Sequence, residues 1–192
     1  MGKFQLKASA YHLNLREIKK LFYVTPSFRD RCLLKALYWA GLRREEATRL
    51  DVRDIDFERK RIKVHGKGGK TRTVPIIDDE FLSDLKHLLG DRTSESVFAG
   101  PSGKSLTTRR INYIVQRAGE RAEIKNPNPA LTHINPHIFR HSIARYLKSK
   151  NFSAEWIQNF LGHASYKTTM DMYGTISIDE MQEEVEKKLQ TD

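Results

Sequence analysis

Hydrophobic residues recur at helical spacing in the first third of the chain. The apolar face of a short amphipathic helix there consists of Leu15, Ile18, Leu21 and Phe22. A second predicted helix spans about 28–40 and is apolar nearly all round at "CLLKALYWA", which is typical of a helix at the centre of a core. Gly41 ends this second helix, and "RREEATRL" predicts another short helix after it.

The periodicity changes between residues 54 and 76, where "DIDFERKRIKVHGKGGKTRTVPI" predicts a few short β segments around a glycine-rich turn at 66–69. Further helices are predicted at about 78–89 and 107–122. We therefore expect an α+β fold that is mainly α, with a small antiparallel β-sheet.

The predicted helix at 107–122 has two distinct faces. Its apolar face consists of Ile111, Ile114, Val115 and Ala118. The opposite face carries a stripe of Arg110, Arg117 and Arg121. This stripe is either ordinary solvated charge or a surface that contacts a polyanion.

The segment "NPHIFRHSIARYL", residues 135–147, predicts a helix with an unusual edge. Pro136 favours a helix start, because its fixed φ suits the first turn and its missing N–H costs nothing there. The core-facing residues would be Phe139, Ile143, Tyr146 and Leu147. A different stripe of the same helix holds His137, Arg140, His141 and Ala144. A cationic, proton-exchanging edge is therefore expected beside a buried face.

The last residues predict a separate acidic helix. Ser177 and Glu180 have the spacing of a capping box. The apolar stripe of this helix consists of Ile178, Met181, Val185 and Leu189. We accordingly divide the chain into a body at 1–176 and a C-terminal amphipathic helix at 177–192. That helix packs either on its own domain or on a neighbouring subunit.

The charge of the chain is strongly basic and unevenly distributed. The net charge is +10 and the pI is about 9.7. Residues 178–192 carry −4, which leaves +14 on the first 177 residues. A body of this kind indicates nucleic acid as its partner, although ribosome-like and membrane-surface proteins share the composition.

Targeting signals and cysteine usage narrow the class of protein. No apolar run approaches the roughly 18–20 residues that span a bilayer, and the N-terminus lacks the apolar core of a secretion signal. A single cysteine, Cys32, excludes an internal disulfide, and its apolar surroundings indicate a buried, unreactive thiol. We therefore expect no membrane association and a cytoplasmic, DNA-associated protein.

The stretch "GKGGKT" is similar to a phosphate-binding P-loop, but two features exclude that motif. Val64 stands where a P-loop needs a glycine, and "TRTVPI" afterwards predicts a strand rather than a helix. What remains is a hairpin turn with Lys67 and Lys70 at its tip. These lysines are either solvated or held toward a phosphate.

Three histidines at a spacing of four, His133, His137 and His141, are similar to a set of metal ligands. Pro136 interrupts the helix between the first two, and no cysteine or carboxylate lies nearby in sequence. We therefore expect no metal site.

Four segments occur in an informative order: "GLRREE", "GKGGKTRTVPI", "HIFRH" and "LGHASYKTTMDMY". Together they resemble the catalytic domain of the tyrosine recombinases, the phage-integrase and Xer family, over roughly residues 13–175. The resemblance implies a catalytic set of Arg43, Lys67, His137, Arg140, His163 and Tyr173. It also implies supporting roles for Glu46, beside the first arginine, and for His141, after the second.

The resemblance further implies a reaction without metal, ATP or any other cofactor. Arg43 and Arg140 would grip the non-bridging oxygens of a phosphodiester with forked hydrogen bonds, and His163 would add a donor. Tyr173 would become joined to the 3′ phosphate. Lys67 is the implied proton donor to the leaving 5′ oxygen, and His137 is the implied proton partner of the nucleophile.

The expected partner is duplex DNA, contacted by Lys70, Arg110, Arg117 and Arg121, with a homo-oligomer of four subunits on paired sites. Only about 40 residues precede Arg43, so the separate N-terminal domain typical of the family is expected to be absent from this chain. Two alternatives stay open, namely a type IB topoisomerase-like strand passage and a DNA-binding relative without recombinase activity.

Overall fold

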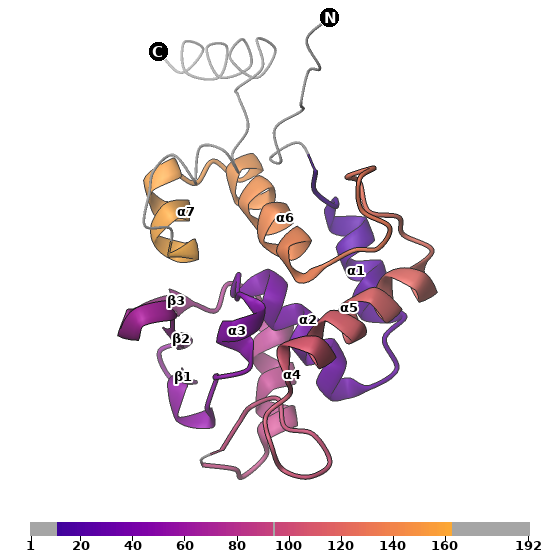
Figure 1. Ribbon diagram of the computed structural model, residues 1–192. Coiled ribbons are helices and arrows are strands. Elements are labelled where there is room, and N and C mark those ends of the chain that lie inside the picture. Colours follow the sequence, from indigo (N-terminus) through magenta and orange to yellow (C-terminus); the bar gives the residue numbers. More distant parts are fainter. Residues whose placement is uncertain (1–10, 94, 163–192) are drawn as a thin grey trace, which may run out of the picture.

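The structure of the chain is a computed structural model that describes residues 11–93 and 95–162 (Figure 1). Its helices are α1 (Leu15–Tyr23), α2 (Phe28–Trp39), α3 (Arg44–Ala47), α4 (Asp79–Leu89), α5 (Thr108–Ala122), α6 (Pro136–Ser149) and α7 (Ala154–Leu161). Its strands are β1 (Ile55–Asp56), β2 (Arg61–His65) and β3 (Thr71–Pro75), with short 3-10 turns η2 (Val52–Asp54) and η3 (Lys67–Gly69). The prediction of a mainly helical α+β fold with a small antiparallel sheet is confirmed.

Helix α2 forms the centre of the core, as its apolar sequence predicts. Ser27 begins the helix by accepting a hydrogen bond from the N–H of Asp30. The helix packs against α1, α3, α4 and α6. Leu33, Leu34 and Leu37 are fully buried, and leaving water stabilises each of them by roughly 2 kcal/mol.

Cys32 lies on the same helix and is buried. Its sulfur approaches the carbonyl of Asp84 on α4, at 3.8 Å. Burial raises the pKa of the thiol to about 12. The sulfur is therefore protonated at neutral pH, which makes it a poor nucleophile.

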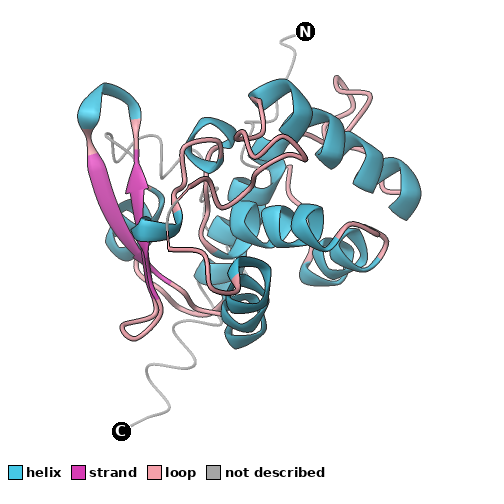
Figure 2. Ribbon diagram, turned by 90° about the horizontal axis from the view of Figure 1, so that it is seen from below, coloured by secondary structure: helices cyan, strands magenta, loops and turns pink. Residues whose placement is uncertain are grey.

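The three strands form one antiparallel sheet in the order β1-β2-β3, at an edge of the helical body (Figure 2). In the pairing of β2 with β3, Ile62 lies opposite Val74 and Val64 lies opposite Arg72. These four side chains share one face of the sheet, since alternate residues of a strand point the same way. The three aliphatic ones are buried, so Arg72 is directed toward the protein interior.

The end of α2 and the end of α7 meet at Gly41. This glycine has a φ of +56°, and a Cβ there would lie 2.8 Å from Cδ2 of Leu161. Ser153 begins α7 by accepting from the N–H of Trp156, and the helix ends at Gly162, with a φ of 64°. The loop after α2 is thereby held beside the C-terminus of α7.

Helix α5 buries the face that the sequence predicts and packs closely on the loop before α6. Thr107 begins the helix by accepting from the N–H of Arg110. Its buried face includes Ile111, Ile114, Val115 and Ala118. A Cβ on Gly119 would lie 2.6 Å from Cγ1 of Ile134, so the absence of a side chain lets that loop approach α5.

Several predictions fall outside the described residues. The acidic helix at 177–192 is one of them, as are His163 and Tyr173. Within the ranges that the structure does describe, no helix combines the length and the apolar character needed to cross a bilayer.

Candidate active site

Arg43 stands at the N-terminus of α3, two residues after Gly41. Its main-chain N–H donates to Oε2 of Glu46 at 2.8 Å, and its Nη1 donates to Oε1 of the same carboxylate at 2.8 Å. A longer bond of 3.4 Å runs from Nη2 to the carbonyl of Gly162. Because 34 % of the side chain remains exposed, the guanidinium is held by Glu46 and still open to an anion.

Glu46 is the carboxylate around which the site is arranged. Only 3 % of its side chain is exposed, and it accepts from Nη1 and Nη2 of Arg72 at 2.7 and 2.9 Å. Burial by itself raises the pKa of Glu46, but the bonds and charge of Arg72, the Arg43 N–H and the charge of Arg140 lower it to about 2. Glu46 is therefore ionised at neutral pH and in direct contact with Arg43.

Arg72, in β3, lies within the segment "GKGGKTRTVPI", but the predicted set of site residues does not include it. Its Nε donates to the carbonyl of Phe160 at 3.1 Å, so one side chain joins β3, α3 and α7. The strand pattern contains a signal for it. Arg72 alternates with Val74 and Ile76, which puts an arginine on the buried face of a strand, where a charge needs a partner.

Arg140, in the second turn of α6, is only 3 % exposed. Its Nη1 donates to the carbonyl of Gly41, and its Nη2 donates to the carbonyl of Leu161 at 2.9 Å. Burial, and after it the charge of Arg43, lowers the pKa of Arg140, yet a guanidinium stays protonated in proteins. Arg140 therefore brings a positive charge to the junction of α2 and α7.

Three guanidiniums thus surround one carboxylate. Arg43 and Arg72 bond Glu46 directly, and the charge of Glu46 also acts on Arg140. With all four groups ionised, positive charge is in excess, and partial burial weakens its screening by water. Forked donors of this kind match an anion with several oxygens, such as a phosphate diester.

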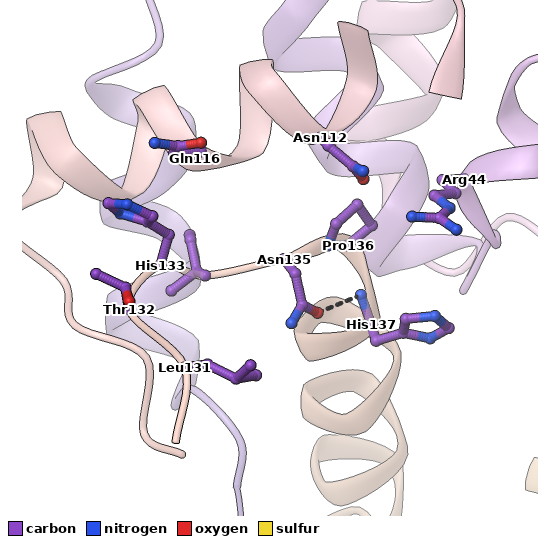
Figure 3. A pocket seen from close by; sticks show the side chains of 10 residues that line it. Arg44, Asn112, Gln116, Leu131, Thr132, His133, Asn135, Pro136 and His137 are labelled. Carbon is purple, nitrogen blue, oxygen red and sulfur yellow. Dashed lines mark hydrogen bonds between the residues drawn. The ribbon is translucent and has the colours of Figure 1, made fainter. Parts of the chain in front are cut away.

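His137 lies on the first turn of α6, at the edge of an open pocket of about 400 Å³ (Figure 3). Its main-chain N–H donates to Oδ1 of Asn135 at 3.0 Å. Its imidazole lies at the same end of the pocket as Arg44. Polar side chains that share the lining are Asn112, Gln116, Thr132 and His133. Partial burial and the charges of Arg140 and Arg44 lower the pKa of His137. The imidazole is therefore neutral at pH 7 and able to accept a proton.

His141 lies one turn further along α6 and is half-buried. Burial, followed by the charges of His137, Arg140 and His12, lowers its pKa to about 4. Among the described residues, its buried Nδ1 has no hydrogen-bond partner. A pKa this far below neutrality makes the His141 imidazole a weak proton acceptor at pH 7, which suits a supporting role.

The other regularly spaced histidine, His133, belongs to the loop before α6. Its Nδ1 lies 3.8 Å from Oε1 of Glu120. In the described part of the chain, no group of three or more histidine, cysteine, aspartate or glutamate side chains could hold a metal ion.

Lys67 and Lys70 flank the tip of the β2–β3 hairpin. The N–H of Gly66 donates to the carbonyl of Lys70 at 2.7 Å and closes the turn. Gly68 and Gly69 have φ values of 71° and 74°, which glycine adopts without strain. The side chain of Lys70 is exposed.

The predicted arginine stripe of α5 is on the surface, but its charge is partly offset. Arg110, Arg117 and Arg121 are all exposed. Arg110 lies over the ring of Tyr113, 5.1 Å from its centroid, and Arg117 pairs with Glu120 at 2.5 Å. The face is therefore less cationic than the three arginines alone suggest.

Comparison with known proteins supports the motif pattern along most of the chain. A family model described as "Phage integrase family" matches residues 12–177. The chain is 34 % identical to tyrosine recombinase XerA of Pyrococcus furiosus over 183 residues, which covers 91 % of this chain and 60 % of that protein. It is 36 % identical to tyrosine recombinase XerD of Staphylococcus epidermidis over 149 residues, covering 74 % of this chain and 48 % of that protein.

Solved structures give the same fold. A crystal structure of XerA recombinase matches with a TM-score of 0.76 and 24 % identity, over 92 % of this chain and 64 % of that chain. XerH site-specific recombinase bound to difH substrate matches with a TM-score of 0.72 and 27 % identity, over 91 % and 51 %. The chain spans about 60 % of the length of the curated XerA relative. Since the family model covers most of its residues, the chain belongs to the phage integrase family of tyrosine recombinases.

Proposed function

We propose that this chain is the catalytic part of a site-specific DNA recombinase. It cleaves and rejoins duplex DNA through a 3′-phosphotyrosyl intermediate and uses neither metal nor ATP. The observation that carries the proposal is the excess of positive charge that Arg43, Arg72 and Arg140 create around Glu46. The names of the relatives support it, since they are tyrosine recombinases and one was solved with its difH substrate.

The arginines act on the charge that develops during cleavage. When a tyrosine hydroxyl attacks a phosphodiester, negative charge grows on the non-bridging oxygens. Arg43 and Arg140 supply forked, charge-assisted donors at positions fixed before the reaction starts. Loss of one preorganised donor in an oxyanion site typically slows the reaction about 10²–10³-fold.

The remaining roles follow the family motif. His137 accepts the proton of the nucleophile Tyr173, whose oxygen then holds the 3′ phosphate. Lys67 gives a proton to the leaving 5′ oxygen, and His163 donates a further hydrogen bond to the phosphate. His141 supports α6 beside Arg140. Rejoining reverses these steps, because the phosphotyrosine conserves the energy of the broken bond.

Duplex DNA is the proposed partner. Lys70, Arg110, Arg117 and Arg121 contact its phosphates, which makes binding sensitive to salt. Exchange of strands between two sites requires four subunits, and the acidic helix at 177–192 connects neighbouring subunits in this assembly.

A suicide-substrate assay tests the proposal. Nicked duplexes carrying candidate sites are incubated with the protein in chelator without ATP, and denaturing gels detect a covalent protein–DNA band. The proposal predicts a band that disappears in Tyr173→Phe. A band that persists in Tyr173→Phe contradicts the choice of nucleophile. Relaxation of supercoiled plasmid that lacks any site would instead favour topoisomerase-like activity, and binding without a band would favour a DNA-binding protein.

A further inference from the structure

Arg72 adds to the positive charge around Glu46 but has no assigned role in the cleavage steps, and it connects three elements of the site. We propose that Arg72 is a positioning residue that fixes the Glu46 carboxylate, and through it the Arg43 guanidinium, in the orientation that grips the scissile phosphate. This inference rests on the proposed function, because Arg43 requires a fixed orientation only if it binds that phosphate.

The hydrogen bonds around Glu46 leave its carboxylate one orientation. Arg72 donates Nη1 to Oε1 at 2.7 Å and Nη2 to Oε2 at 2.9 Å, a two-point contact that sets the plane of the carboxylate. The same two oxygens accept from Nη1 and the N–H of Arg43, at 2.8 Å each. Rotation of the carboxylate therefore breaks bonds to both arginines at once.

Because the Arg72–Glu46 pair is largely buried, it keeps its geometry more firmly than a surface ion pair does. The exposed fractions of the two side chains are 13 % for Arg72 and 3 % for Glu46. Exposed pairs are screened and reorient freely, whereas a buried and fully bonded pair keeps its geometry. Arg43, at 34 % exposed, depends on this buried pair for its own alignment.

A second contact of Arg72 sets the position of the α7 terminus. Its Nε donates to the carbonyl of Phe160 at 3.1 Å. A Cβ on Gly162 would lie only 2.6 Å from Cδ of Arg72, so the stem of Arg72 occupies the space beside this glycine. Gly162 in turn accepts from Nη2 of Arg43 and directly precedes His163 in the sequence.

The ion pair also ties the hairpin to the arginine site. Arg72 is paired with Val64 across the β2–β3 hairpin, whose tip carries Lys67. The bond from Arg72 to Glu46 therefore fixes the position of the hairpin relative to the N-terminus of α3. Loss of Arg72 would therefore release both the Arg43 guanidinium and the hairpin that carries Lys67 from this fixed arrangement, although both residues would still be present.

The first test needs no DNA. The carboxyl of Glu46 is titrated by carbon NMR in the wild-type protein and in Arg72→Gln. Arg43 and Arg140 still face Glu46 in the variant, but the bonds from β3 are gone, so its pKa should rise from about 2. Arg92→Gln is the matched control, since Arg92 donates to the carbonyls of Ser96 and Leu88 instead. An unchanged titration in Arg72→Gln would overturn the proposal.

The second test uses single-turnover cleavage of the nicked duplex. Arg72→Gln should slow cleavage about 10–100-fold, the usual scale for misplaced catalytic groups, and leave the Kd for DNA within about twofold. Arg72→Lys, which keeps the charge but not the fork, should recover part of the rate. The double variant of Arg72→Gln with Glu46→Gln should be no slower than Glu46→Gln alone, because Arg72 acts through Glu46.

The outcomes separate the two proposals. Multiplicative losses in the double variant, or a Kd that weakens in step with the rate and with Tm, would reduce Arg72 to a structural residue. A wild-type protein that forms no covalent product contradicts the proposed function instead. In that case the Glu46 titration still decides whether Arg72 holds that carboxylate.

Discussion

Arg43 and Arg140 are proposed to grip one phosphate, but they are built into the protein in different ways. Arg43 is 34 % exposed and bonds chiefly to a carboxylate. Arg140 is 3 % exposed and donates to the carbonyls of Gly41 and Leu161. We therefore expect the two arginines to matter equally for the rate of cleavage, and Arg140 to contribute more than Arg43 to the free energy of unfolding.

Substitution of each arginine by glutamine should show this difference. Arg140→Gln leaves two buried carbonyls without donors and should lower the free energy of unfolding by about 1–3 kcal/mol. Arg43→Gln leaves Glu46 paired with Arg72 and should cost about 1 kcal/mol or less. Both should slow cleavage at least about 100-fold. Urea unfolding and single-turnover cleavage measure the two quantities, and equal losses of stability would contradict the assigned contacts.

The ionisation of Glu46 predicts how stability depends on pH. Folding lowers its pKa from 4.5 to about 2, so its contribution is complete above pH 5 and disappears as the pH falls through about 2. The deficit of Glu46→Gln relative to wild type should be on the order of 3 kcal/mol at pH 7 and shrink between pH 5 and 2. Urea unfolding at a series of pH values measures it. A deficit that stays constant over that range would contradict the account.

At the level of elements, the arginine site depends on the contact between the end of α2 and α7. Gly41 accepts from Arg140, has a left-handed backbone, and has no room for a Cβ beside Leu161. Any side chain at this position would push α7 away and move the acceptor of Arg140.

Gly41→Ala tests that contact. Strain at its φ of +56° accounts for about 1–2 kcal/mol, and the clash with Leu161 should add about 1–3 kcal/mol. Gly68→Ala is the matched control for stability, because Gly68 has a φ of 71° and open space around it. Thermal unfolding compares the two variants. If both lose the same stability, the packing of α7 on Gly41 is not what requires glycine.

The sequence patterns predicted the elements better than the connections between them. The apolar character of α2, the hairpin around its glycines, the apolar face of α5 and the start of α6 at Pro136 all depend on neighbours a few residues away. Local periodicity records such neighbours. The Arg72 contacts do not have this character, since Glu46 is 26 residues away and Phe160 is 88 residues away along the chain. Only the folded structure brings these groups together.

The whole molecule separates its charge, with a basic body of +14 and a terminal segment of −4. A body of this charge attracts DNA at long range. Each proposed contact of a lysine or arginine with a phosphate then releases condensed counterions from the DNA. The face of α5 contributes less than its arginines suggest, because Glu120 pairs with Arg117.

The salt dependence of DNA binding should show whether the exposed arginine face of α5 contacts DNA. Arg121→Gln should lower the slope of log K against log salt by about 0.9, the value for one lost phosphate contact. Arg53→Gln is the control, since Arg53 is already paired with Asp51 at 2.8 Å. Fluorescence anisotropy over a range of salt concentrations gives both slopes. Equal slopes for Arg121→Gln and wild type would remove this arginine from the DNA surface.

Arg43 and Arg140 are proposed above all to stabilise charge on the scissile phosphate. In a duplex with a methylphosphonate at that position, a methyl group replaces one non-bridging oxygen and the linkage is neutral, so it offers less charge for an arginine to stabilise. Single-turnover cleavage of both duplexes by wild type and by Arg43→Gln forms a complete cycle. The account predicts a loss of about 100-fold or more on the phosphodiester and a much smaller loss on the methylphosphonate. Equal losses on the two substrates would mean that Arg43 does not act on that charge.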